Sequence, residues 1–151
     1  MGVELLVDLE SISLRSAGPA TGCIAVNLGG EFFPSARWND FVVVIVEAWA
    51  SALLRLLRRS SDVERVHFME GPYAIEIERI ENGQLRLRAI AHPNRVRAYA
   101  DVSSTGLAKA LLTVGQGVLQ KCRRGGYANR DVERLADALA SLHEEVLSSI
   151  N

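Results

Sequence analysis

Residues 63–102 read VERVHFMEGPYAIEIERIENGQLRLRAIAHPNRVRAYADV, and this stretch decides the fold. Turn-forming residues interrupt it three times, at 70–72 (EGP), 82–83 (NG) and 92–94 (HPN). Between these turns, apolar residues alternate with polar or charged ones, with the period of two that is typical of a half-buried strand. We therefore predict a meander of four antiparallel strands, with one face apolar and the other charged.

The pairing of the two middle strands follows from their charges. If residues 81–83 form a three-residue loop with Gly83 in the left-handed conformation, each glutamate faces an arginine, Glu78 facing Arg86 and Glu76 facing Arg88. A two-residue Asn-Gly turn would instead place one arginine opposite another, which disfavours that register. We therefore predict the three-residue register.

Two strands and a helix precede the meander. Alternating residues predict strands at 3–9 and 23–28. Residues 41–57 form the most apolar run, which is shorter than the roughly 20 apolar residues of a membrane span and is interrupted by Glu47, and the helical pattern extends to residue 59. We predict a buried helix here, with Asn39 or Asp40 as its N-cap.

Two helices follow the meander. The first is expected after a cap at residues 103–105 and ends at Gly125-Gly126, and the second begins after Asn129. The order ββ-α-ββββ-α-α predicts an α+β fold in a single domain, residues 1–151. It would have an antiparallel sheet of about six strands with three helices packed on one face.

Composition limits the classes of function. The chain has 151 residues, 17 basic and 18 acidic, for a net charge of −1. This balance argues against a dedicated nucleic-acid-binding protein, which usually has a basic excess. The first residues lack the pattern of a signal peptide, and Cys23 and Cys122 are isolated, as in reduced proteins. We expect a cytoplasmic protein that binds neither nucleic acid nor a membrane.

No complete catalytic or metal-binding motif is found in the sequence. The histidines His67, His92 and His143 lack the spacing of zinc ligands, and neither a nucleophile elbow nor a phosphate-binding loop is present. We predict no metal, no cofactor and no catalytic residue, and therefore a protein that is not an enzyme. The alternative is a small enzyme with a dispersed site made from Asp40, Glu70 and His67.

Charged side chains on the predicted meander are the first candidates for contact with a partner. They share the outward positions of the sheet: Glu76, Glu78, Arg86, Arg88, Arg95 and Arg97. A second candidate area contains Trp38 and Glu70, in two turns that combine aromatic and acidic residues, as protein-binding hot spots often do. The competing interpretation is a solvated charged face, with aromatic turns that only cap the core.

The two aromatic turns resemble a pattern seen in small bacterial proteins of toxin-immunity loci. The pattern combines Phe33-Pro34, Trp38 and Asp40-Phe41, then a long apolar helix with Trp49, then residues 68–73 (FMEGPY). The resemblance implies a cytoplasmic immunity protein that binds a cognate toxin domain and blocks its active site, as in contact-dependent growth inhibition. The near-neutral charge argues against a strongly basic nuclease as the partner.

Two other functions remain open from the sequence. One is the dispersed enzyme site described above. The other is a structural or adaptor subunit that forms homodimers through an edge strand.

Overall fold

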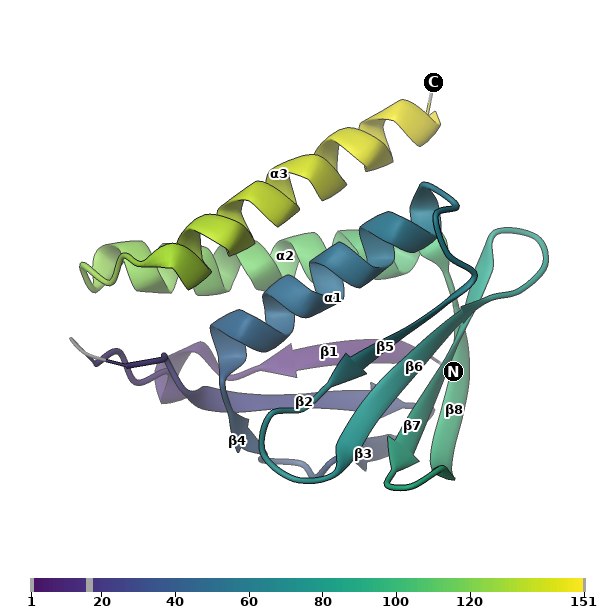
Figure 1. Cartoon of the computed structure of the whole chain (residues 1–151), viewed down its shortest axis with the longest axis horizontal. Coiled ribbons are helices and arrows are strands. Elements are labelled where there is room, and N and C mark those ends of the chain that lie inside the picture. Colours follow the sequence, from purple (N-terminus) through teal and green to yellow (C-terminus); the bar gives the residue numbers. More distant parts are fainter. Residues whose placement is uncertain (1, 16–17, 151) are drawn as a thin grey trace.

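The computed structural model describes residues 2–15 and 18–150, and over these residues the chain is α+β (Figure 1). Positions 1, 16–17 and 151 of the predicted domain lie outside the described residues. The helices and strands, in chain order, are β1 (Val3–Val7), the 3-10 helix η1 (Leu9–Ser11), β2 (Gly22–Leu28), β3 (Glu31–Phe33), β4 (Asn39–Asp40), α1 (Val42–Leu57), β5 (Val63–His67), β6 (Tyr73–Arg79), β7 (Gln84–Ala91), β8 (Arg95–Ser103), α2 (Ser104–Arg124) and α3 (Arg130–Ile150).

The predicted meander is confirmed as the antiparallel sheet β5-β6-β7-β8. Its central register is the predicted one, with Glu78 opposite Arg86 and Glu76 opposite Arg88. The turn between β6 and β7 combines two features. Asn82 and Gly83 both have positive φ, as in a type I′ turn, while the backbone N–H of Ile80 donates to the carbonyl of Gln84. The three-residue register therefore contains an Asn-Gly turn at its tip.

A bulge in the β7–β8 pair changes one of the predicted positions. Ala89 lies opposite Ala98, but Ile90 lies opposite Val96, so Arg97 is the extra residue on β8. The bulge places Arg95 opposite Ala91, and Ala91 lies on the opposite face of β7 from Ile90 and Arg88. The prediction that Arg95 shares the face of Arg97 is therefore wrong.

The single six-stranded sheet that we predicted is replaced by two sheets of four strands among the described residues. β2 pairs with β1 along one edge, and along the other it pairs with β3 and β4. β2 is thus the centre of the N-terminal sheet, and no strand pair joins this sheet to the meander among the described residues. The short strands β3 and β4 lie in the segment that sequence reasoning treated as an aromatic turn.

The three predicted helices are confirmed within the described residues. α1 is buried along most of its length, including the fully buried Trp49. Ser103 caps α2 by accepting from the N–H of Gly106, and Asn129 Oδ1 accepts from the N–H of Val132 at the start of α3. Among the described residues, none of the helices has the combination of length and apolarity needed to cross a bilayer.

The helices lie on one side of the sheets, in two layers (Figure 1). α1 packs on β5 and α2 packs on β1 and β8, whereas α3 packs on α1 and α2 as the outer layer. The three helices therefore lie on one side, as predicted, but α3 packs on the other two helices instead of on the sheet. This packing buries one face of β5–β8, including Ile75, Ile77 and Leu87.

Candidate protein-binding face

The other face of the β5–β8 sheet, here called the outer face, carries its side chains in three rows across the strands. The strand register sets the members of each row. The first row is His67, Ala74, Ile90 and Val96; the second is Arg65, Glu76, Arg88 and Tyr99; the third is Val63, Glu78, Arg86 and Asp101. Charged groups therefore gather in the second and third rows, and the first row is mainly apolar.

Ion pairs connect the second and third rows. Arg88 Nη1 lies 2.8 Å from Glu78 Oε1 and 3.4 Å from Glu76 Oε1, so this guanidinium bridges both glutamates. On the other side of Glu76, Arg65 Nε lies 3.1 Å from Oε2. These four side chains bring two positive and two negative charges together, which holds their orientations and leaves the centre of the face close to neutral.

Arg86 pairs with a different acid from the one that faces it across the hairpin. Its Nε and Nη2 lie 2.7 Å and 2.9 Å from the two carboxylate oxygens of Asp101 on β8, a bidentate geometry. The guanidinium carbon also lies 5.5 Å from the centre of the Tyr99 ring. The predicted contact between Arg86 and Glu78 is thus replaced by a contact with the next strand.

The Arg86–Asp101 pair shifts the pKa of both of its members. Its hydrogen bonds hold the pKa of Asp101 below its usual value and raise the pKa of Arg86. Both groups are therefore charged at neutral pH, although each remains in contact with solvent.

Large apolar side chains surround the charges. Val63 is 45% exposed, Val96 51% and Tyr99 64%. Arg97, also exposed, lies at the bulge of β8 and has no ion pair among the described residues. Exposed aromatic and branched side chains next to ordered charges are the usual materials of a protein-binding surface.

The second predicted area, Trp38 and Glu70, is organised around a buried carboxylate. Asp40 is fully buried, and its Oδ2 accepts from the indole N–H of Trp38 at 2.9 Å and from the backbone N–H of Glu70 at 3.1 Å. Its Oδ1 accepts from the backbone N–H of Phe41 at 2.7 Å. Asp40 therefore joins the segment before α1 to the loop between β5 and β6, while the side chain of Glu70 is exposed.

The predicted N-cap of α1 is wrong, and the same contacts explain why. The cap position is Phe41, which follows both predicted candidates, Asn39 and Asp40. Asp40 does not cap the helix because its carboxylate is engaged by Trp38 and Glu70. Trp38 also packs edge-on against Tyr73, with ring centres 5.3 Å apart, which further fixes the loop between β5 and β6.

The structure does not bring Asp40, Glu70 and His67 together in one pocket. Asp40 is buried with both oxygens occupied by donors, whereas His67 lines a surface pocket that contains neither Asp40 nor Glu70. In the part of the chain that the structure describes, no group of three or more His, Cys, Asp or Glu side chains could hold a metal ion.

Two further ionisable groups lie away from the outer face. Hydrogen bonds from Arg55 hold the pKa of Glu64 below its usual value, where the two side chains join α1 to β5. Burial raises the pKa of the Cys122 thiol, which is free and lies in the core on α2. Neither group is on the outer face.

Sequence reasoning missed several residues of this face. The bidentate pair of Arg86 with Asp101 was missed because it depends on side-chain geometry. Arg65, His67 and His92 come together only because β5 pairs with β6 and β6 with β7. Comparison of the chain with family models, curated proteins and solved structures gave no match, so function is argued from the geometry.

Proposed function

We propose that this chain is a non-enzymatic binding protein, and specifically a cytoplasmic immunity protein that neutralises a cognate bacterial toxin domain. In this proposal the toxin contacts the outer face of β5–β8, and blocking of the toxin's active site requires no chemistry from the chain itself. The resemblance of the aromatic turns to toxin-immunity proteins suggests the kind of partner.

The observation that carries the proposal is the uncovered outer face. The helices pack on the opposite face of the same strands, so Arg88, Tyr99 and their neighbours remain available to another molecule. Ion pairs already hold the charged side chains in place, which lowers the entropy lost when a partner binds. Tyr99, stacked near Arg86 and 64% exposed, supplies the type of anchor that dominates binding energy in many interfaces.

The charges of this face favour a protein over a nucleic acid. Arg65, Arg86 and Arg88 each have an acidic partner within 3.1 Å. A phosphate backbone would have to compete with those carboxylates and would be repelled by them. A protein surface with mixed charges can instead add to the existing pairs.

The test is co-expression with the toxin domain encoded beside this chain, together with calorimetric measurement of binding between the two purified proteins. We expect the wild-type chain to restore growth and to bind the toxin domain. Arg88→Glu reverses a charge between two glutamates, and Tyr99→Ala removes the aromatic anchor. Each should weaken binding by at least about 2 kcal/mol, or roughly 30-fold.

Matched controls lie on α3, in the outer helical layer. Arg134→Glu makes the same charge reversal at an exposed position, and Leu147→Ala truncates a side chain that is 49% exposed. Both should bind the toxin like the wild type. Equal loss of affinity in the α3 and outer-face variants would contradict the assigned face, and failure of the wild-type chain to bind or protect would contradict the function.

Sedimentation separates this proposal from the adaptor alternative. We expect a monomer at high protein concentration, since the proposed partner is a different chain. A homodimer that Tyr99→Ala dissociates would show instead that the outer face joins two copies of this protein.

A further inference from the structure

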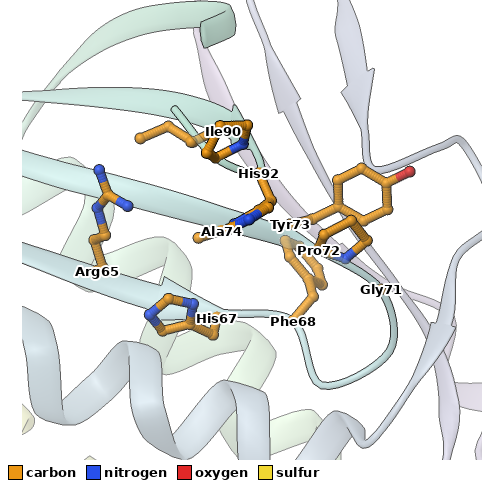
Figure 2. Close-up of a pocket in the computed structure, with 10 residues that line it drawn as sticks. Arg65, His67, Phe68, Gly71, Pro72, Tyr73, Ala74, Ile90 and His92 are labelled. Carbon is orange, nitrogen blue, oxygen red and sulfur yellow. The ribbon is translucent and has the colours of Figure 1, made fainter. Parts of the chain in front are cut away.

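A pocket of about 120 Å³ opens at the end of the outer face, next to the loop between β5 and β6 (Figure 2). Ala74 and Ile90 line it from the first row of the sheet, and Phe68, Pro72, Tyr73 and Pro93 contribute further apolar surface. Basic side chains complete the lining: Arg65 and His67 from β5, and His92 from the turn after β7. The pocket therefore lies between the charged rows and the loop that Asp40 and Trp38 hold in place.

The pocket results from the small residue in the first row. Ala74 is paired with His67 on one side and with Ile90 on the other, and its methyl group leaves the space between them unfilled. Although strand alternation places Ala74 and Ile90 on the outer face, they are only 5% and 4% exposed. The neighbouring side chains thus shield these two residues and make a real depression of the surface.

The ionisable side chains of the pocket are basic, apart from the phenol of Tyr73, and no acidic side chain among the described residues lines it. Arg65 donates through Nε to Glu76, but the four N–H groups of its terminal nitrogens have no hydrogen-bond partner among the described residues. The imidazoles of His67 and His92 are exposed and each can donate at least one N–H. The pocket therefore offers several donors and no carboxylate in its lining, although the Nε of Arg65 is already engaged by Glu76.

The volume of the pocket and the side chains that line it indicate which chemical group it can bind. At roughly 30 Å³ for each water-sized group, the volume suits about four heavy atoms. A methylene group would contact Ala74 and Ile90, while a carboxylate attached to it would meet the donors of the three basic side chains. We propose that this pocket binds the carboxylate of an aspartate or glutamate side chain carried by the partner protein. The inference rests on the proposed function and specifies an anchor residue of the partner.

A test that needs no partner uses the whole chain and acetate as the probe. Side-chain NMR signals of His67, His92 and Arg65 are followed while sodium acetate replaces sodium chloride at constant ionic strength. We expect saturable shifts at these residues, with His143 on α3, also exposed, as the internal control that does not respond. Shifts that stay linear, or that are equal at His143, would overturn the pocket as a carboxylate site.

Two variants and a second anion sharpen the result. Ala74→Val fills the pocket while keeping its charges, and Arg65→Gln removes a donor while keeping the pocket open. Each should weaken acetate binding at least about tenfold. A folded Ala74→Val protein that binds acetate like the wild type would contradict the proposal. Saturation by inorganic phosphate at a lower concentration than by acetate would also overturn the carboxylate assignment.

Binding to the toxin domain separates this inference from the function on which it rests. The double variant His67→Ala/His92→Ala should bind the toxin about tenfold more weakly than the wild type. If it binds equally well while Tyr99→Ala does not, the pocket assignment fails and the proposed function stands. If the wild-type chain binds acetate but no toxin domain, the proposed function fails instead.

Discussion

The two faces of the β5–β8 sheet are built from the same four strands but have opposite properties. On the inner face, Ile75, Ile77 and Leu87 are completely buried in the core. On the outer face, Glu76, Arg88 and their neighbours remain partly exposed and are held by ion pairs. Alternation along each strand thus separates the residues that form the core from those that we propose contact a partner.

The largest expected effect is on the inner face. Leu87→Ala removes a fully buried side chain and leaves a cavity, so the free energy of unfolding should fall by about 2–5 kcal/mol. Urea unfolding measures this change. The fraction of molecules that remains folded should still bind the toxin domain with wild-type affinity. A loss below about 1 kcal/mol would mean that the helices do not pack on this face as described.

A slightly smaller effect is expected at Asp40, which lies in β4 of the other sheet and so belongs to neither face of β5–β8. Asp40→Ala leaves the indole N–H of Trp38 and the backbone N–H groups of Phe41 and Glu70 without their acceptor. We expect a loss of about 2–4 kcal/mol in urea unfolding. Glu70→Gln is the control, since only its backbone contacts Asp40, and its stability should change by no more than about 0.5 kcal/mol. Similar losses in both variants would show that the side chain of Glu70 has a structural role of its own.

A charged pair on the inner side of β5 gives a test by pH. The pKa of Glu64 is lowered in the folded chain by hydrogen bonds from Arg55, so its stabilisation is complete above the unfolded pKa and is lost as pH falls through the folded pKa. Glu64→Gln should therefore lower the unfolding free energy by about 1 kcal/mol at pH 7. The difference from the wild type should begin to shrink as pH falls below the unfolded pKa of a glutamate, about 4.3, and should vanish only below the lowered folded pKa.

Unfolding curves between pH 3 and pH 7 check this prediction. Arg55→Gln should give the same pH dependence, because it removes the other half of the pair. A destabilisation by Glu64→Gln that persists unchanged in acid would contradict the role of the charge.

The smallest effect on stability is expected on the outer face. Glu78→Gln weakens a partly exposed ion pair with Arg88, and the unfolding free energy should change by less than about 0.5 kcal/mol. Affinity for the toxin domain should nevertheless fall, since the orientation of Arg88 depends on this pair. A large loss of stability with unchanged binding would reverse the roles that we assign to the two faces.

Much of the meander could be predicted from local chemistry. The charges of Glu76, Glu78, Arg86 and Arg88 were sufficient to choose the register, because like charges and mixed polarity disfavour the alternative. The bulge that separates Arg95 from Arg97 could not be predicted, since it interrupts an otherwise regular alternation. Strands β3 and β4 were missed because segments of three and two residues carry no periodic signal.

The candidate face was predicted only in part. Residues such as Arg88 were correctly placed on a charged face, but Arg86 binds Asp101 instead of the glutamate opposite it on β6. The pocket near His92 was not predicted, because its lining comes from separate strands and turns whose distances depend on the folded sheet. The role of Asp40 was missed for the same reason, since its partner Glu70 is 30 residues away.

The order of residues in this chain determined its longer strands, its helices, the meander register and most of the separation of apolar from charged positions. These depend on periodicity and on pairs of neighbouring strands. Tertiary structure decided that the strands form two sheets, that helices cover the apolar face of β5–β8, and that basic side chains meet around Ala74. Such features depend on which elements compete for the same edge or face, and that competition is resolved only when the whole chain packs.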